Sequence, residues 1–131
     1  MCFIDDGDSA TVWRETSHRA AKAHKCAECS REIQPGERYW SVFAIWDGDP
    51  GTYKTCAHCR VGQDWLKRNC GGFMHQGLLE EMEEHAEEYP HLALGLLRIK
   101  VGIRRRWRRF DGAGLMPVQH APRDVSVAEP A

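Results

Sequence analysis

The chain of 131 residues has no apolar run approaching about 18 residues, so no segment resembles a membrane-spanning helix. Its first residues, Met1 to Asp6, lack the basic and apolar stretches of a secretory signal. We therefore expect a cytoplasmic protein with no membrane partner. In that compartment we expect the six cysteines to be metal ligands or reduced thiols rather than disulfides. The length suits one compact unit.

The sequence also lacks a net charge of either sign, because 18 Lys and Arg stand against 19 Asp and Glu. A dedicated nucleic-acid binder usually carries a net positive charge. The charges are nevertheless segregated, since residues 76–90 contain six Glu and no Lys or Arg, whereas residues 98–110 contain seven cations and no acid. These seven cations are the candidate residues for binding a partner or nucleic acid: Arg98, Lys100, Arg104, Arg105, Arg106, Arg108 and Arg109.

Two C-x-x-C pairs, Cys26 with Cys29 and Cys56 with Cys59, are the most specific motif in the chain, with residues 30–55 between them. Two intervening residues allow a tight turn to direct both thiolates of a pair at one ion. Two such pairs complete the tetrahedral shell of a structural zinc site. We therefore predict one Zn(II) per chain, with iron as the remaining alternative for a four-thiolate site. No fourth position is left open for a catalytic water.

Residues 38–46 are aromatic and β-branched and precede a cluster of turn formers at 47–51, which predicts a strand and a hairpin loop. Residues 52–55 supply a short return strand. Alternation places two sets of side chains on opposite faces, and because neither set is mainly polar we expect both faces to be covered. The sets are Trp40, Val42, Ala44 and Trp46 on one face, and Tyr39, Phe43 and Ile45 on the other.

Three helices are predicted after the hairpin: residues 59–69, 78–89 and 91–110, with Pro90 between the last two. A knuckle, a hairpin and a helix carrying the second cysteine pair follow one another in the order of a treble clef. The predicted fold is therefore α+β, a small treble-clef-like zinc domain followed by two C-terminal helices. We predict three regions: residues 1–75 as the zinc domain with an N-terminal arm, 76–110 as an acidic and then basic helical segment, and 111–131 as a flexible tail.

Enzymatic interpretations fit poorly. His85-Ala86-Glu87 matches the H-x-E of zinc deaminases, but both C-x-x-C pairs precede it and four cysteines leave no place for a water. Nucleases with a His-Asn-His motif need His and Asn around the hairpin, and residues 30–55 contain neither. We expect no catalytic residues and no small-molecule substrate.

Several metal-binding residue types lie outside the two pairs. Cys70 and His75, with Cys2 or His85 brought in by the fold, form a possible second metal site. The alternative is that Cys70 is a small buried apolar side chain and that the histidines, His58 included, lie at the surface.

Residues 23–39, the stretch Tyr53 to Cys59 and the stretch Cys70 to Phe73 together resemble small, uncharacterised zinc proteins of bacteriophages and prophages. The resemblance spans about residues 20–80 and implies a treble-clef or zinc-ribbon-like domain in a bacterial host cell. Proteins of this kind often bind host proteins or nucleic acid, and some inhibit host defence. The resemblance does not extend to the basic segment.

Two functions follow from these features. The first is a protein-interaction module held together by structural zinc and directed at a host protein, for example in a defence or regulatory system, with a phage protein as another possible partner. In this hypothesis the chain folds back at Pro90, so that the Glu-rich segment neutralises part of the basic one. The alternative is a nucleic-acid-binding protein that contacts phosphates with residues 98–110. Trp107 and Phe110 then either stack on bases or, as their helical spacing favours, belong to the core.

Overall fold

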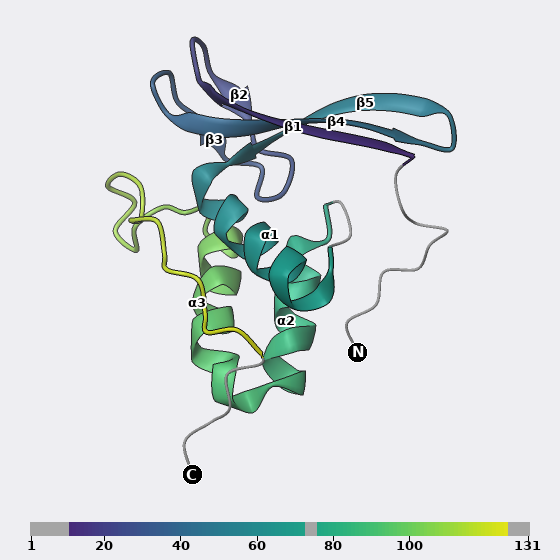
Figure 1. Ribbon diagram of the computed structural model, residues 1–131. Coiled ribbons are helices and arrows are strands. Elements are labelled where there is room, and N and C mark those ends of the chain that lie inside the picture. The colour runs from purple at the N-terminus through teal and green to yellow at the C-terminus, as the bar shows by residue number, and fades with distance from the viewer. Residues whose placement is uncertain (1–10, 73–75, 126–131) are drawn as a thin grey trace.

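The computed structural model describes residues 11–72 and 76–125 and has an α+β fold with two small sheets and three α-helices. The three-stranded sheet lies on one side, α1 packs beneath it, and α2 and α3 lie beyond α1 (Figure 1). Among the described residues, no helix is long and apolar enough to cross a membrane. The elements are β1 (Val12–Arg19), β2 (His24–Lys25), β3 (Glu32–Ile33), β4 (Arg38–Trp46), β5 (Asp49–Cys56), α1 (Ala57–Cys70), α2 (Leu78–Glu88), the 3-10 helix η2 (Pro90–Leu92) and α3 (Ala93–Arg104).

The large sheet is antiparallel with the order β1-β4-β5. Strand β4 has the predicted bounds. The hairpin is tighter than predicted, because Asp47 and Gly48 alone form the turn, both with positive φ, and β5 begins at once. Strand β1 was not predicted. It pairs with β4 along its whole length, from Val12 opposite Ile45 to Arg19 opposite Arg38.

One face of this sheet is covered by α1. Glu15 of β1 forms ion pairs with Arg60 and Lys67 of α1, and the Arg60 guanidinium lies 5.2 Å from the ring centroid of Trp40. On the opposite face, Tyr39 is buried but Phe43 is exposed. The expectation that both faces are covered is therefore wrong for the Phe43 side.

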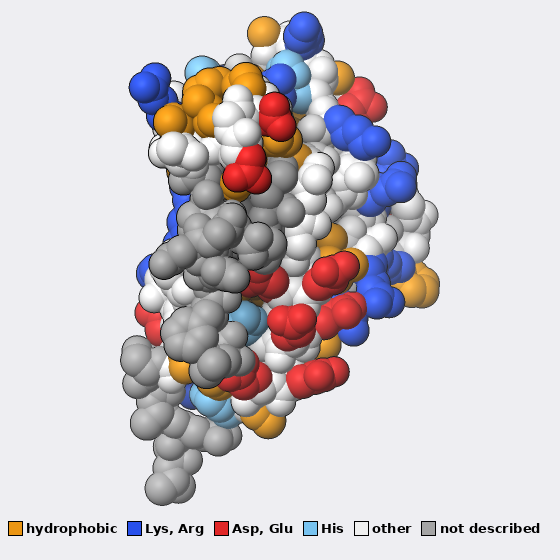
Figure 2. All heavy atoms as spheres, turned by 90° about the vertical axis from the view of Figure 1, so that its right-hand side faces the viewer, with side chains coloured by type: hydrophobic (Ala, Val, Ile, Leu, Met, Phe, Trp, Pro, Cys, Tyr) orange, Lys and Arg blue, Asp and Glu red, His pale blue; other side chains and the backbone are white. Residues whose placement is uncertain are grey.

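Helices α2 and α3 run antiparallel on either side of Pro90 (Figure 1). Glu83 of α2 pairs with Lys100 and Arg104 of α3, so the fold-back brings part of the acidic surface against part of the basic one. The acidic side chains of α2 gather in the lower half of one molecular face (Figure 2).

One buried cluster joins the cysteine region to these helices. It extends from Cys26 and Cys59 through Trp65 to Ile99 and Trp107. Gly62 of α1 allows this close packing, because a Cβ there would lie 3.2 Å from Leu78 Cδ1. The core therefore continues across residue 75, where the sequence predicted a boundary.

Helix α3 ends at Arg104, six residues before the predicted end at Phe110. Arg106 and Trp107 both have positive φ, which reverses the chain direction. As a result the Trp107 side chain is fully buried, as predicted, whereas Phe110 is 88% exposed. The assignment of Phe110 to the core was wrong. We call residues 105–109 the arginine turn.

The region predicted as a flexible tail, residues 111–131, contacts the helices between Met116 and Val125, whereas residues 111–115 are exposed; residues 126–131 lie outside the described residues. The Trp65 indole N–H donates to the carbonyl oxygen of Arg123 at 3.0 Å, and the Val125 amide donates to Asn69 Oδ1 at 2.7 Å. Pro122 covers Gly95 of α3. The segment is thus held by hydrogen bonds to α1 and by an apolar contact with α3.

Candidate metal centre

The structure brings together the four cysteines that were predicted as ligands. All four are buried, and their sulfur atoms lie within 4.8 Å of one another. The Cys29 and Cys56 sulfurs are 3.9 Å apart. In a tetrahedron with metal–sulfur bonds of about 2.3 Å, sulfur atoms are separated by about 3.8 Å. The cluster therefore has the ligand type, number and spacing of a closed metal site, and zinc fits it well.

The first pair is held by the small β2-β3 sheet. The amide of Cys26 donates to the Arg31 carbonyl at 2.9 Å, and the amide of Ser30 donates back to the Cys26 carbonyl at 3.0 Å. Ser30 has φ 64°, which closes the turn after Cys29. The buried Arg31 guanidinium pairs with Glu37, and this ion pair ties the turn to the segment that enters β4.

The second pair lies where β5 becomes α1. Cys56 is the N-cap of the helix, and its sulfur accepts a hydrogen bond from the Cys59 amide at 3.5 Å. Cys59 follows in the first turn. A helix N-terminus carries a partial positive charge that stabilises thiolate. The second C-x-x-C therefore serves both as a ligand pair and as the start of α1.

Two further N–H groups face the sulfurs. The Cys56 amide donates to Cys26 Sγ at 3.4 Å, and the Trp107 indole Nε1–H donates to Cys59 Sγ at 3.3 Å. Four thiolates around a divalent ion carry a net negative charge, and such donors offset it. The Trp107 contact comes from 48 residues further along the chain and was not predicted.

The thiol pKa values depend on one another. Hydrogen bonds from the other three thiols hold the pKa of Cys26 far below its ordinary range. The proximity of Cys26 in turn raises the pKa of Cys56 and Cys59, since a second thiolate beside the first is unfavourable without a cation. A bound metal ion supplies that cation.

His58, between the two ligands of the second pair, is buried, contrary to the expectation that it lies at the surface. Its ring stacks on Trp107 with 5.0 Å between the ring centroids. Burial, and to a smaller degree the charge of Arg31, lowers the pKa of His58 to about 4. The imidazole is therefore neutral near pH 7 and packs as part of the wall around the cluster.

The predicted second site is not supported, because the Cys70 sulfur belongs to a disulfide and is no thiolate ligand. The expectation that the cysteines are metal ligands or reduced thiols is therefore wrong for Cys70. His85 is buried, its Nδ1–H donates to the Glu81 carbonyl oxygen at 2.7 Å, and its Nε2 lies 2.8 Å from the Cys70 sulfur. Cys2 and His75 lie outside the described residues. Within the described ranges, the four-cysteine cluster is the one group of three or more potential ligands.

The seven predicted cations separate into two sets. Lys100 and Arg104 share the single carboxylate of Glu83, and Arg109 lies 3.9 Å from Asp111. Arg98, Arg106 and Arg108 are exposed, and no ion pair to a described residue is found for them. The guanidinium of Arg105 lies 4.4 Å from the ring centroid of the exposed Phe110.

No protein-family model, curated protein or solved structure matches the chain.

Proposed function

We propose that the chain is a protein-interaction module built around one structural zinc ion in a treble-clef-like site, encoded by a phage and directed at a host protein in the bacterial cytoplasm. A defence or regulatory protein of the host is the type of partner that the family resemblance suggests. The zinc ion has a structural role in this proposal, because four cysteines occupy all four positions of a tetrahedral shell.

The observation that carries the proposal is the distribution of exposed apolar side chains. Apart from Phe43, the large apolar residues exposed in the described ranges lie on α3 or on the segment that follows it. Three of them line one hollow together, namely Leu94, Leu97 and Val101, and exposed apolar surface bordered by charge is typical of a protein-binding site. The residues are Leu94, Leu97, Val101, Phe110, Leu115 and Val118.

Affinity capture with the full-length, zinc-loaded chain tests this function. We expect a defined host polypeptide, identified by mass spectrometry, to co-purify with the wild type. The variant Leu97→Glu should lose this polypeptide, and Phe43→Glu, which adds the same charge on the free face of the sheet, should retain it. Loss of the polypeptide in both variants, or in neither, would contradict a binding site on α3.

A second candidate function is nucleic-acid binding by the arginine turn. Phe110 is 88% exposed beside the Arg105 guanidinium, an arrangement on which a base can stack. The net charge of −1 argues against this function. If nucleic acid is the partner, protein eluted at moderate salt should carry material that absorbs at 260 nm, and replacing Arg105, Arg106 and Arg108 with Gln should remove it.

A further inference from the structure

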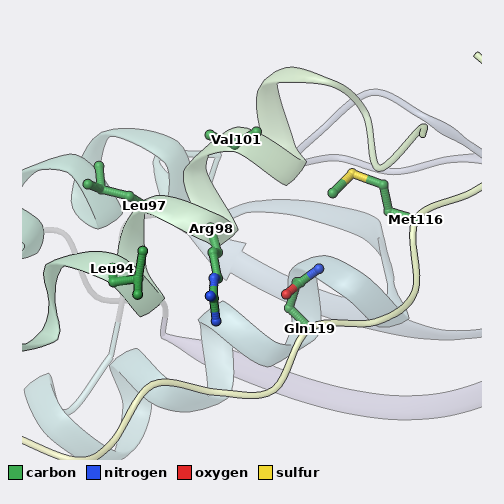
Figure 3. A pocket seen from close by; sticks show the side chains of 6 residues that line it. All are labelled: Leu94, Leu97, Arg98, Val101, Met116 and Gln119. Atoms are coloured by element: carbon green, nitrogen blue, oxygen red, sulfur yellow. The ribbon is translucent and has the colours of Figure 1, made fainter. Parts of the chain in front are cut away.

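A groove runs between α3 and the segment that returns along it. Arg98 extends from the helix toward this segment (Figure 3). The groove encloses about 320 Å³. A second hollow of about 290 Å³ adjoins it, and Arg98 and Gln119 line both hollows. We call the two hollows together the α3 groove. The first hollow is lined by Leu94, Leu97, Arg98, Val101, Met116 and Gln119.

The apolar wall of this groove is a regular helical stripe. Leu94, Leu97 and Val101 are 67%, 40% and 44% exposed, and their spacing of three and four residues places them on one side of α3. The opposite side of the helix is buried through Leu96 and Ile99. A helix that is apolar on both sides is ordinarily covered on both. The exposed stripe therefore has the character of one half of an interface.

The charges that line the groove are of one sign. Arg98 and Arg123 contribute guanidinium groups, and neither hollow is lined by a described Asp or Glu. On the other side of α3, Lys100 and Arg104 share Glu83. On one edge of α3 the cations thus share a carboxylate of α2, whereas at the groove edge no carboxylate is found among the described residues.

We propose that the α3 groove binds an acidic amphipathic helix of the partner protein. Apolar side chains of the ligand lie against Leu94, Leu97 and Val101, and its carboxylates pair with Arg98 and Arg123. The stripe from residue 94 to 101 is about 10 Å long, or two helical turns, which matches a ligand with apolar residues at i, i+3 and i+7. This inference rests on the proposed interaction function and adds the chemistry of the partner.

The probe is a fluorescein-labelled peptide of about 16 residues, with Leu at helical spacing and Glu at the intervening positions. Two comparison peptides replace every Glu with Gln or with Lys. Fluorescence polarisation is measured against the full-length, zinc-loaded chain, with circular dichroism to verify that each variant is folded. We expect the Glu peptide to bind at least about tenfold more tightly than the Gln peptide.

Variants test the apolar part and the charged part of the groove separately. Leu97→Glu and Arg98→Glu should each weaken binding of the Glu peptide by about tenfold or more. Arg98→Glu should in addition bind the Lys peptide better than the wild type does. The matched controls Phe43→Glu and Arg14→Glu alter exposed residues on the free face of the sheet and should leave binding unchanged.

Equal binding of the Glu and Gln peptides, or unchanged binding by folded Arg98→Glu, would overturn the proposal. The proposal would also be overturned if oligothymidine displaced the Glu peptide equally well from the wild type and from Leu97→Glu. The groove would then bind phosphate groups and not an acidic helix. Sedimentation that shows a dimer broken by Leu97→Glu would instead place a second copy of the chain in the groove and also overturn it. If binding of a captured host protein requires Leu97 but not Arg98, the proposed interaction function stands and the proposal of an acidic ligand helix is wrong.

Discussion

The indole Nε1 of Trp107 lies 3.3 Å from the sulfur of Cys59 and donates a hydrogen bond to it. Trp107 is fully buried and forms the centre of the arginine turn, whose chain direction is set by the positive φ of Arg106 and Trp107. The Trp107 side chain therefore links the arginine turn to the cysteine cluster, while backbone hydrogen bonds such as that from the Met116 amide to the Trp107 carbonyl hold the turn itself.

The first prediction concerns this hydrogen bond. Trp107→Phe keeps an aromatic ring but removes the N–H that faces the sulfur, so zinc affinity should fall by about tenfold or more. Competition with a chromophoric chelator measures this affinity. Trp65→Phe is the matched control, because it removes an indole hydrogen bond to the Arg123 carbonyl and should leave zinc affinity unchanged. Equal zinc affinity of Trp107→Phe and wild type would show that the contact does not tune the site.

Gly102 is the second point at which Trp107 constrains the fold. A Cβ at Gly102 would overlap the Trp107 ring, which is enclosed by the core. Alanine favours the helix by up to about 1 kcal/mol, but the overlap should make Gly102→Ala destabilising by about 1–3 kcal/mol. Gly95→Ala should be less damaging, because its Cβ would lie 3.1 Å from Pro122, a much milder contact than the overlap at Gly102. Urea unfolding compares the two, and equal losses would contradict the close packing on Trp107.

The third prediction concerns the metal ion. Purified protein should contain one zinc per chain by elemental analysis, and a chelator should unfold it, because zinc in such sites contributes on the order of 10 kcal/mol. Cys56→Ser removes a thiolate ligand but leaves a hydroxyl oxygen that can still cap α1, so loss of the metal and of folded structure in this variant would report the ligand alone. Cys70→Ser removes a disulfide outside the cluster but no ligand of it, so the variant should retain zinc. Full zinc retention by Cys56→Ser would refute the four-cysteine site.

Strand β4, the three helices and the grouping of the four cysteines were predictable because their signals are local. The apolar run of β4 ends at the turn formers Asp47 and Gly48, and each C-x-x-C pair fixes its own turn. Strand β1 was not predicted because polar residues occur on both of its faces. Glu15 lies on the face covered by α1, and the cations that pair with it there are more than 40 residues away in the sequence.

The error at the end of α3 has a different origin. The helical spacing of apolar residues continues through Trp107 to Phe110, so periodicity alone extends the helix. The chain turns instead because Trp107 fits against His58 and Cys59, contacts that no local pattern contains. The contacts of Arg123 and Val125 could not be predicted for the same reason, since their partners Trp65 and Asn69 lie on α1, far away in the sequence.

The fourth prediction concerns Glu15, which links β1 to α1. Although burial raises its pKa, hydrogen bonds from Lys67, Trp13 and Arg60 lower it from 4.5 to about 2. A carboxylate with a depressed pKa stabilises the fold fully above pH 4.5, and this contribution is lost as the pH falls toward 2. Glu15→Gln should therefore cost about 1–3 kcal/mol at pH 7, and its deficit relative to wild type should shrink below pH 4.5.

Chemical unfolding of both proteins at several pH values tests this, and because acid release of metal affects both proteins, the difference isolates Glu15. A deficit that does not change with pH would show that Glu15 contributes packing but no charge interaction.

The last prediction concerns the arginine turn. The structure shows no ion pair between Arg105, Arg106 or Arg108 and a described carboxylate, whereas Arg104 is paired with Glu83. Replacing these three arginines with Gln should change the free energy of unfolding by less than about 0.5 kcal/mol per residue, as for most surface substitutions. Because unpaired exposed cations steer an acidic partner, the same variant should bind the captured host protein with a slower association rate and a weaker dependence on salt. Stopped-flow kinetics at two ionic strengths measure both quantities. A large loss of stability, rescued by neutralising Glu84 and Glu87, would show that the turn instead balances the acidic surface of α2.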